Sequence, residues 1–376
     1  MTEQLLGGLT PRQFLDEYWQ KKPLLIRQAI PGFSGVVELD ELFELACDED
    51  VESRLIRHDA AAGWQLTHGP QDAAELEQRD QPWTVLVQGL NLWLREADEL
   101  LHRFSFIPQA RLDDLMVSYA TDGGGIGAHF DSYDVFLLQG IGRRRWRIGD
   151  QSAHRLVEGA PLKLIDDFQP TEEWVLEPGD MLYLPPRYAH EGTAIGECTT
   201  YSIGFRAPQA QELGREFLGW LSERLELPGM YADPDLKLQG NSAEIGPAMV
   251  ARIRNMLDAI RWKPDEVADF LGHYLSEPKP QIFFIPPEEP LPRADFDAAV
   301  RQHGFVLDPA TLLLFHERAF YLNGDAFNVP AAAFDAFAQL AHARQLPGEP
   351  ELSDTVLRGL YALYQNGLGL PDHNED

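Results

Sequence analysis

The sequence predicts an α+β protein whose centre is an antiparallel β barrel or double-stranded jelly roll, with helical segments around it. Two observations predict this fold class. Between residues 111 and 206, short strand-like runs are separated by turns rich in glycine and proline. Beyond residue 206, apolar residues recur at helical spacing. The length of 376 residues exceeds one average domain, so we expect two or three domains.

The elements follow in order along the chain. The first hundred residues have the pattern of mixed α/β structure, with helices expected over residues 11–19 and 39–47 and a strand over residues 23–27. Barrel strands are expected over residues 115–120, 134–139, 144–148, 174–178, 181–185 and 199–205. Three helices are then expected near residues 213–225, 249–260 and 264–275. Because no strand lies between these helices, we expect them to form a layer separate from the barrel.

The last hundred residues are expected to hold a small domain behind a linker. Residues 276–292 contain six prolines and predict the linker. Beyond it we expect a helix, a hairpin turn and two further helices, at residues 295–303, 323–324, 331–344 and 353–365. This order resembles a winged-helix module, a type that often binds DNA. However, residues 276–376 hold six basic against fifteen acidic residues, so we expect a structural or protein-contact role instead.

Composition and charge narrow the class of function. Hydrophobic residues make up 44% and charged residues 24%, which excludes wholesale disorder and a coiled-coil rod. No run approaches the roughly 20 apolar residues of a membrane span, and no export signal is visible, so we expect no membrane association. Two cysteines, Cys47 and Cys198, cannot build a disulfide framework, which favours a cytoplasmic location. The net charge of −29 favours a basic partner over nucleic acid, although it also fits a role in solubility alone.

The strongest chemical signal is the sequence His129-Phe130-Asp131, followed 59 residues later by His190. On an extended segment, residues i and i+2 share a face, so His129 and Asp131 can reach one cation. Two imidazoles and a carboxylate on one face of an octahedral ion form the triad of non-haem Fe(II) oxygenases. An isolated His-x-Asp is also a common accident in a chain with 11 histidines. The surroundings favour a site, because both segments begin beside turns rich in glycine or proline, as a barrel mouth requires.

The second signal is the run GRRRWRIG at residues 142–149. On a strand, Arg144, Trp146 and Ile148 share one face, and the apolar members should turn that face inward. A buried Arg144 cation would then need an anionic partner, such as the far carboxylate of a dicarboxylate that chelates iron. The alternative is that the four arginines form a solvated edge or pair with internal acidic residues.

The chain resembles the bacterial ribosomal oxygenases of the JmjC class, which are 2-oxoglutarate- and Fe(II)-dependent hydroxylases. The resemblance rests on four motifs, namely FLDEYWQKKPLLI, DDLMVSYATDGGGIGAHFDSYDVFLLQGIGRRRWRIGD, EPGDMLYLPPRYAHEG and YSIGFRAP. It implies a cupin-like double-stranded β-helix core. It also implies an oxygenase domain over residues 1–207 with its barrel at about 108–207, a helical dimerisation region over 208–276, and a winged-helix-like domain over 277–376.

The resemblance also implies the site and the substrate. His129, Asp131 and His190 would bind Fe(II), and Arg144 would hold the distal carboxylate of 2-oxoglutarate. The substrate would be an arginine of large-subunit ribosomal protein sixteen, hydroxylated at its β-carbon by a cytoplasmic homodimer. The arginine pocket would be lined by Asp114, Met116, Tyr133 and Ser202. A carboxylate can receive a guanidinium and a ring can stack on it, but Asp114 could also be a solvated turn residue, and Met116 and Tyr133 ordinary core.

Three other functions remain open from the sequence. An N-methyl demethylase would use the same iron chemistry and release formaldehyde. A non-oxidative metal barrel, such as a sugar-phosphate isomerase, is less compatible with Asp131 and an inward Arg144. A non-enzymatic scaffold could use the acidic surface to bind a basic protein, but it would not need all three candidate ligands.

Overall fold

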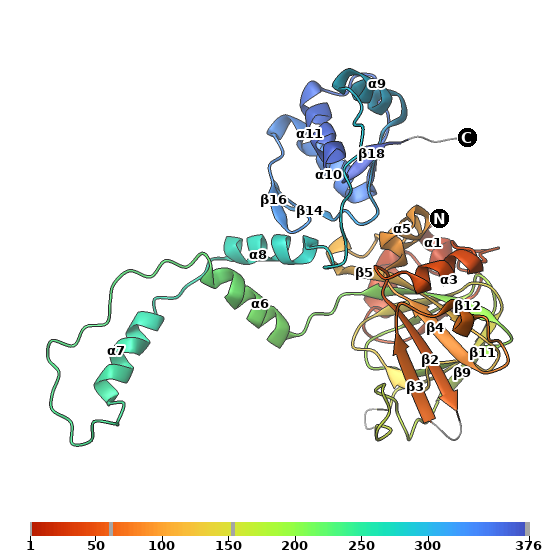
Figure 1. The fold of residues 1–376 in the computed structure, drawn as a ribbon, viewed down its shortest axis with the longest axis horizontal. Helices are drawn as coiled ribbons and strands as arrows, with labels where there is room; N and C mark the ends of the chain where they lie inside the picture. Colours follow the sequence, from red (N-terminus) through yellow and green to blue (C-terminus); the bar gives the residue numbers. More distant parts are fainter. Residues whose placement is uncertain (1, 60–62, 152–154, 373–376) are drawn as a thin grey trace. The chain divides into compact units, whose positions relative to one another are not determined.

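The computed structural model describes residues 2–59, 63–151 and 155–372 (Figure 1). The N-terminal third begins with short helices and strands that lead into the barrel. Its elements are α1 (Thr2–Leu5), α2 (Pro11–Glu17), β1 (Leu24–Ile26), α3 (Leu39–Cys47), β2 (Ser53–Asp59), β3 (Gly63–His68), α4 (Ala73–Leu76), β4 (Trp83–Val87) and α5 (Arg95–His102). The helices expected at 11–19 and 39–47 and the strand at 23–27 are confirmed, whereas β2, β3, β4 and α5 add to what the sequence predicted.

Two antiparallel sheets form the barrel. The remaining barrel strands are β5 (Leu112–Ala120), β6 (His129–Phe130), β7 (Val135–Gln139), β8 (Arg143–Gly149), β9 (Glu172–Leu176), β10 (Met181–Leu184), β11 (Ala189–Ile195) and β12 (Cys198–Phe205). One sheet has the order β1-β10-β7-β12-β5-β4-β2-β3, and the other has the order β6-β11-β8-β9. Strands adjacent in a sheet are far apart in sequence, as in β12 between β5 and β7. The expected jelly-roll core is therefore confirmed.

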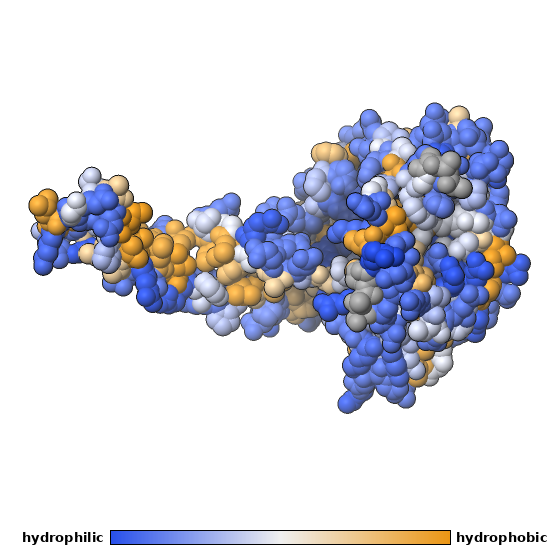
Figure 2. All heavy atoms as spheres, turned by 90° about the horizontal axis from the view of Figure 1, so that it is seen from below, coloured by the Kyte–Doolittle hydropathy of each residue, from blue (hydrophilic) through white to orange (hydrophobic). Residues whose placement is uncertain are grey.

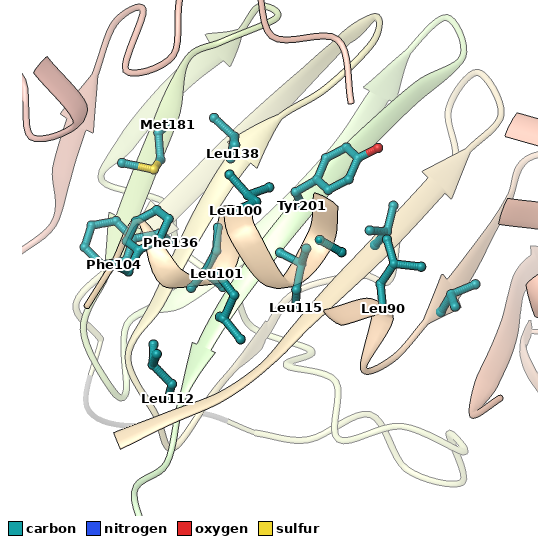
Figure 3. Close-up of a cluster of buried hydrophobic side chains, with 14 of the residues drawn as sticks. Leu90, Leu100, Leu101, Phe104, Leu112, Leu115, Phe136, Leu138, Met181 and Tyr201 are labelled. Carbon is teal, nitrogen blue, oxygen red and sulfur yellow. The ribbon is translucent and has the colours of Figure 1, made fainter. Parts of the chain in front are cut away.

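The outer face of the large sheet carries the main hydrophobic core. Figure 3 shows Leu100, Leu101 and Phe104, from α5 and the turn after it, beside side chains of the sheet. The facing side chains come from strands β5, β7, β10 and β12, and they include Leu115, Phe136, Leu138, Met181 and Tyr201. Because side chains alternate along a strand, the neighbours of these residues point to the other face, into the space between the two sheets.

The inner space between the sheets is apolar at one end. A second cluster of buried side chains there includes Val135, Leu137, Trp146, Ile148, Leu176, Leu182 and Leu184. The inward face predicted for Trp146 and Ile148 is thus confirmed. Apolar side chains cover both faces of the sheet at this end of the barrel. A polar side chain on the inner face there is destabilising unless another polar group forms a hydrogen bond with it.

The chain divides into two compact units. The first comprises Met1–Ala207, Pro278–Leu312 and Val329–Asp376, so much of the C-terminal region groups with the barrel. This region contains α9 (Arg293–His303), β13 (Phe305–Leu307), α10 (Phe334–Ala343), β17 (Gln345–Leu346), α11 (Asp354–Gln365) and β18 (Gly369–Pro371). A buried ion pair joins it to α5, because Nε of Arg344 lies 2.6 Å from Oδ2 of Asp98.

The second unit comprises Pro208–Glu277 and Leu313–Asn328. It contains the expected helices α6 (Ala210–Ser222), α7 (Pro247–Leu257) and α8 (Pro264–Ser276), together with β14 (Leu313–His316), β15 (Ala319–Leu322) and β16 (Asp325–Phe327). The hairpin turn expected at Asn323 and Gly324 is confirmed between β15 and β16. Its sheet packs on α8, where the Tyr321 hydroxyl donates to Asp269 at 3.1 Å.

Helix α7 contrasts with the other helices of the second unit, because none of its residues is buried. Its exposed apolar side chains include Met249, Val250, Met256 and Leu257. In Figure 2 apolar residues gather at the surface around this helix, at the left end of the view. Within the described part of the chain, no helix is long and apolar enough to cross a bilayer.

Candidate functional site

The three candidate metal ligands come together at the rim of the smaller sheet. His129 lies on β6 and is the cross-strand partner of His190 on β11, while Asp131 follows directly after β6. One donor atom from each residue lies within 4.8 Å of the others. The ring centroids of the two histidines are 4.2 Å apart, and Nε2 of His190 is 3.6 Å from Oδ2 of Asp131. The geometry predicted from the i, i+2 spacing is therefore present.

Backbone contacts fix the orientation of both imidazoles. Nδ1 of His129 lies 3.0 Å from the Gly127 carbonyl oxygen, and Nδ1 of His190 lies 3.0 Å from the Tyr188 carbonyl oxygen. Because a carbonyl oxygen can only accept, each Nδ1 must carry the hydrogen and donate it. This leaves Nε2 of each ring as the nitrogen that can bind a metal ion, which is the arrangement that metal-binding histidines adopt.

The electrostatics of His190 favour metal binding. Burial, reinforced by the neighbouring His129 and opposed by Asp131, lowers the pKa of His190 to about 4. The imidazole is therefore neutral near pH 7, and a metal ion can bind only the neutral form. No proton has to be expelled from this ring at physiological pH before a cation enters.

The glycine run before His129 brings this segment against the barrel wall. A Cβ at Gly125 would lie 2.4 Å from the Gly192 carbonyl oxygen, and Gly125 forms an isolated bridge with Thr193 of β11. Gly127 has φ +88°, a left-handed conformation that side chains disfavour. Close approach at one glycine and a left-handed turn at the next bring β6 alongside β11, which places His129 opposite His190.

Arg144 lies on the same inward face of β8 as Trp146 and Ile148, as predicted, and so faces the space between the two sheets, called the chamber below. Its side chain is only 3% exposed, and Nη1 donates to the Ser118 hydroxyl at 3.1 Å. Within the described residues, its Nε and Nη2 atoms have no hydrogen-bond partner. On β8, Arg144 lies four residues before Ile148, the cross-strand partner of His190, a separation of about 13 Å along the strand. A buried guanidinium with unused donors lowers the stability of the fold unless an anion pairs with its charge and accepts its hydrogen bonds.

The opposite face of β8 shows why only one arginine of the run is buried. Arg143 is exposed, and Arg147 forms an ion pair with Glu191 on the neighbouring strand. The alternation predicted for this strand is thus confirmed, and the alternative of a wholly solvated basic edge is wrong.

Two polar residues of the inner face were not predicted from the sequence. Ser118 on β5 contacts Arg144, and the Thr84 hydroxyl on β4 is buried without a hydrogen-bond partner among the described residues. Thr84 faces Ala120 across the sheet, two residues along β5 from Ser118. The alternation of β5 could have identified Ser118, because it shares a face with Asp114 and Met116.

The four residues of the expected arginine pocket also lie in one region. Asp114 and Met116 are on β5, and Ser202 on β12 is the cross-strand partner of Met116. Tyr133 lies in the loop between β6 and β7, two residues after Asp131. A Cβ placed on Gly204 would lie 3.4 Å from Oδ1 of Asp114 and 4.0 Å from the Tyr133 ring, so this carboxylate and this ring are near neighbours.

Asp114 is not the solvated turn residue that the sequence left open. Its side chain is only 13% exposed, and burial raises its pKa above the ordinary aspartate value. Tyr133 is 37% exposed, and burial together with Asp131 and Asp114 raises the pKa of its hydroxyl. A largely buried carboxylate beside a partly open aromatic ring is suited to a planar cation.

The donor set fits Fe(II) and a dicarboxylate. Two imidazoles and one carboxylate on a single side of the site leave further coordination positions open, as in the facial triad of non-haem iron oxygenases. The unpaired donors of Arg144 fit a carboxylate at the far end of a ligand bound by the triad. The fold and the site thus fit one class of protein, the iron- and oxo-acid-dependent oxygenases built on a double-stranded β-helix.

Comparison with known proteins identifies the family. Residues 99–213 match the JmjC domain family, and residues 259–368 match the ROXA-like winged helix. The chain is 34% identical over 359 residues to the ribosomal protein uL16 3-hydroxylase of Escherichia coli, covering 94% of this chain and 95% of that protein. The chain therefore belongs to the JmjC-type ribosomal oxygenases.

Solved structures support the same assignment. The X-ray structure of Escherichia coli YcfD superposes with a TM-score of 0.83 at 32% identity, covering 96% of this chain and 98% of that one. A structure of YcfD in complex with cobalt and 2-oxoglutarate has a TM-score of 0.81, with the same identity and coverage. The fold class expected from the sequence, including the winged-helix component, is confirmed.

Proposed function

We propose that this protein hydroxylates the β-carbon of an arginine in ribosomal protein uL16, using Fe(II), 2-oxoglutarate and O₂. One structural observation supports this most strongly: a His-Asp-His triad and a buried arginine with unused donors face the same chamber. The similarity over nearly the whole chain to a protein named for uL16 3-hydroxylation supports the substrate.

Each site residue has a distinct role in this proposal. His129, Asp131 and His190 hold Fe(II) through two Nε2 atoms and a carboxylate oxygen. Arg144, oriented by Ser118, binds the distal carboxylate of 2-oxoglutarate, and the Thr84 hydroxyl offers a further polar contact in the same chamber. When bound, iron with its cosubstrate and O₂ supplies the oxidation that converts a C–H bond to C–OH, while 2-oxoglutarate becomes succinate and CO₂.

The pocket residues position the substrate. Asp114 receives the arginine guanidinium, Tyr133 stacks on it, and Met116 and Ser202 line the wall between them and the chamber. Binding the guanidinium end leaves the carbon atoms nearer the substrate backbone to approach the metal. The apolar cluster around Trp146 keeps the chamber poor in water, which protects the reactive step.

The remaining features suggest how the protein meets its substrate. Ribosomal proteins are basic, and the net charge of −29 favours their approach while disfavouring nucleic acid. The exposed apolar side chains of α7 support a homodimer built through the helical region over 208–276. A ribosomal protein substrate supports a cytoplasmic location. In this proposal the oxygenase domain spans residues 1–207, the dimerisation region spans 208–276, and the winged-helix-like domain spans 277–376.

Mass spectrometry of uL16 after incubation with the enzyme, Fe(II) and 2-oxoglutarate tests the proposal. We expect a gain of one oxygen on a single arginine, with one succinate formed for each hydroxylation. The His129→Ala variant should yield unmodified uL16 and is the matched control. Formaldehyde release from a methylated substrate, with no gain of oxygen on uL16, would favour a demethylase instead. Unmodified uL16 with no turnover of 2-oxoglutarate would favour a scaffold.

A further inference from the structure

Asp114 has a cationic neighbour within the protein itself. Nζ of Lys279 lies 3.7 Å from Oδ2 of Asp114, and the Gly89 backbone N–H donates to the same oxygen at 3.1 Å. Lys279 lies in the proline-rich segment expected to be a linker, and it belongs to the same compact unit as the barrel. Its side chain is 32% exposed against 13% for Asp114, so the lysine is the more accessible partner.

The two carboxylate oxygens of Asp114 have different surroundings. Oδ2 faces Lys279 and Gly89, whereas Oδ1 lies on the side of Gly204 and Tyr133. The separation of 3.7 Å is longer than a hydrogen bond, so the ammonium interacts with the carboxylate mainly through its charge. The carboxylate therefore retains capacity for a cation that can approach from the Tyr133 side.

Charges of both signs surround Asp114. Burial has the largest effect and raises the pKa of Asp114, the charge of Lys279 lowers it, and the charges of Asp113 and Glu52 raise it. Arg206 lies 3.7 Å from Asp113 and partly offsets that charge. A loosely placed ammonium, that of Lys279, thus lies beside this buried carboxylate.

We propose that Lys279 is a specificity-determining residue that makes the pocket select arginine over lysine. This inference rests on the proposed function, in which Asp114 receives the substrate cation. A guanidinium presents two parallel N–H donors and can engage both oxygens of Asp114, an interaction stronger than the attraction between Asp114 and the more distant Lys279 ammonium. A substrate lysine would offer only a second ammonium, so it gains nothing by displacing the first and is repelled if Lys279 stays.

Two peptides and four variants test this role. The peptides are a uL16 fragment with its target arginine and the same fragment with lysine at that position. Binding is measured by fluorescence anisotropy, without O₂, to full-length enzyme loaded with Fe(II) and 2-oxoglutarate, so that no turnover occurs. Lys279→Gln should reduce the preference for the arginine peptide by about tenfold, mainly through tighter binding of the lysine peptide. Lys22→Gln, which removes an exposed cation of the same unit, should leave the preference unchanged.

Lys279→Arg separates this role from a structural one. A guanidinium at residue 279 would hold Asp114 more firmly and compete with the substrate, so the arginine peptide should bind several-fold more weakly. If Lys279 only stabilised the fold, arginine would replace it without loss, and that result would overturn the inference. An unchanged peptide preference in Lys279→Gln would overturn it as well.

Asp114→Asn distinguishes failure of the inference from failure of the proposed function. If Asp114→Asn leaves binding of the arginine peptide unchanged, the proposed pocket is wrong and the inference falls with it. If Asp114→Asn weakens that binding while the Lys279 variants retain the full preference, only the role of Lys279 is wrong.

Discussion

The barrel chamber and the helical unit depart from ordinary packing in opposite ways. Inside the barrel, polar groups such as the Arg144 guanidinium and the Thr84 hydroxyl are buried with unused hydrogen-bonding capacity. In the helical unit, apolar side chains are exposed, with Met230 at 90% and Leu238 fully accessible. Both arrangements are costly for an isolated chain, and each indicates a different kind of partner.

This contrast between buried polar groups and exposed apolar side chains indicates which kind of partner each region binds. A buried donor without an acceptor needs a small polar ligand that fits inside the protein, because no protein surface could reach it. An exposed apolar helix face needs a large apolar surface, which only another polypeptide or a second copy supplies. Substitutions of the buried polar groups in the barrel should therefore affect the use of 2-oxoglutarate. Substitutions of the exposed apolar side chains in the helical unit should affect association with another chain.

Removing a metal ligand should have the largest effect on the chamber. We expect His190→Ala to reduce uL16 hydroxylation by on the order of a thousandfold, because metal coordination contributes several kcal/mol to the reaction. Succinate formation and iron content per chain measure the effect. His316→Ala, which changes an exposed histidine of the helical unit, should retain full activity. Full iron binding by His190→Ala would contradict the triad.

Removing the buried cation tests the other end of the chamber. Arg144→Met should raise the KM for 2-oxoglutarate by roughly a hundredfold, since a charge-assisted contact contributes about 1.5–3 kcal/mol. The iron content should stay unchanged, because Arg144 lies far along β8 from His190. Arg143→Met removes an exposed cation from the opposite face of the same strand and is the matched control. Equal KM values for 2-oxoglutarate in the two variants would contradict the role of Arg144 in binding the distal carboxylate.

A charge on α7 should affect association while the chamber stays intact. Leu257 is 56% exposed, so Leu257→Asp should cost the folded chain little. Across a dimer interface the same carboxylate would be buried and unpaired, and we expect the dimer dissociation constant to rise at least about tenfold. Analytical ultracentrifugation measures the shift, with Asn255→Asp on the same helix as the control. An unchanged dimer, or a wild-type chain that is monomeric throughout, would contradict a dimer built on this face.

Residues with local signals could be predicted from the sequence. His129, Asp131 and Arg144 were identified because strand alternation relates residues two apart, and the turns beside them are marked by glycine and proline. Ser118 was not identified, because it meets Arg144 only through the packing of strands from distant parts of the chain. Thr84 was not identified either, because its burial follows from the pairing of β4 with β5. Lys279 lies in a segment that composition marks as a linker, and composition carries no information about which carboxylate it meets.

The smallest effect should come from the wall of the chamber. Gly192 is the cross-strand partner of Trp146, and an added Cβ would lie 2.8 Å from the Trp146 ring and 3.1 Å from Cδ of Arg144. Gly192→Ala should cost about 1–3 kcal/mol of unfolding free energy through overpacking, and it should raise the KM for 2-oxoglutarate several-fold by displacing the guanidinium.

Thermal unfolding and 2-oxoglutarate kinetics check this prediction together. Gly214→Ala on α6, where an added Cβ meets no atom within 4 Å, should be neutral or slightly stabilising and leave the KM unchanged. A loss of stability in Gly192→Ala without any change in KM would mean that the position of Arg144 tolerates crowding. Gly192 would then be needed for the packing of Trp146 and not for the position of the Arg144 guanidinium.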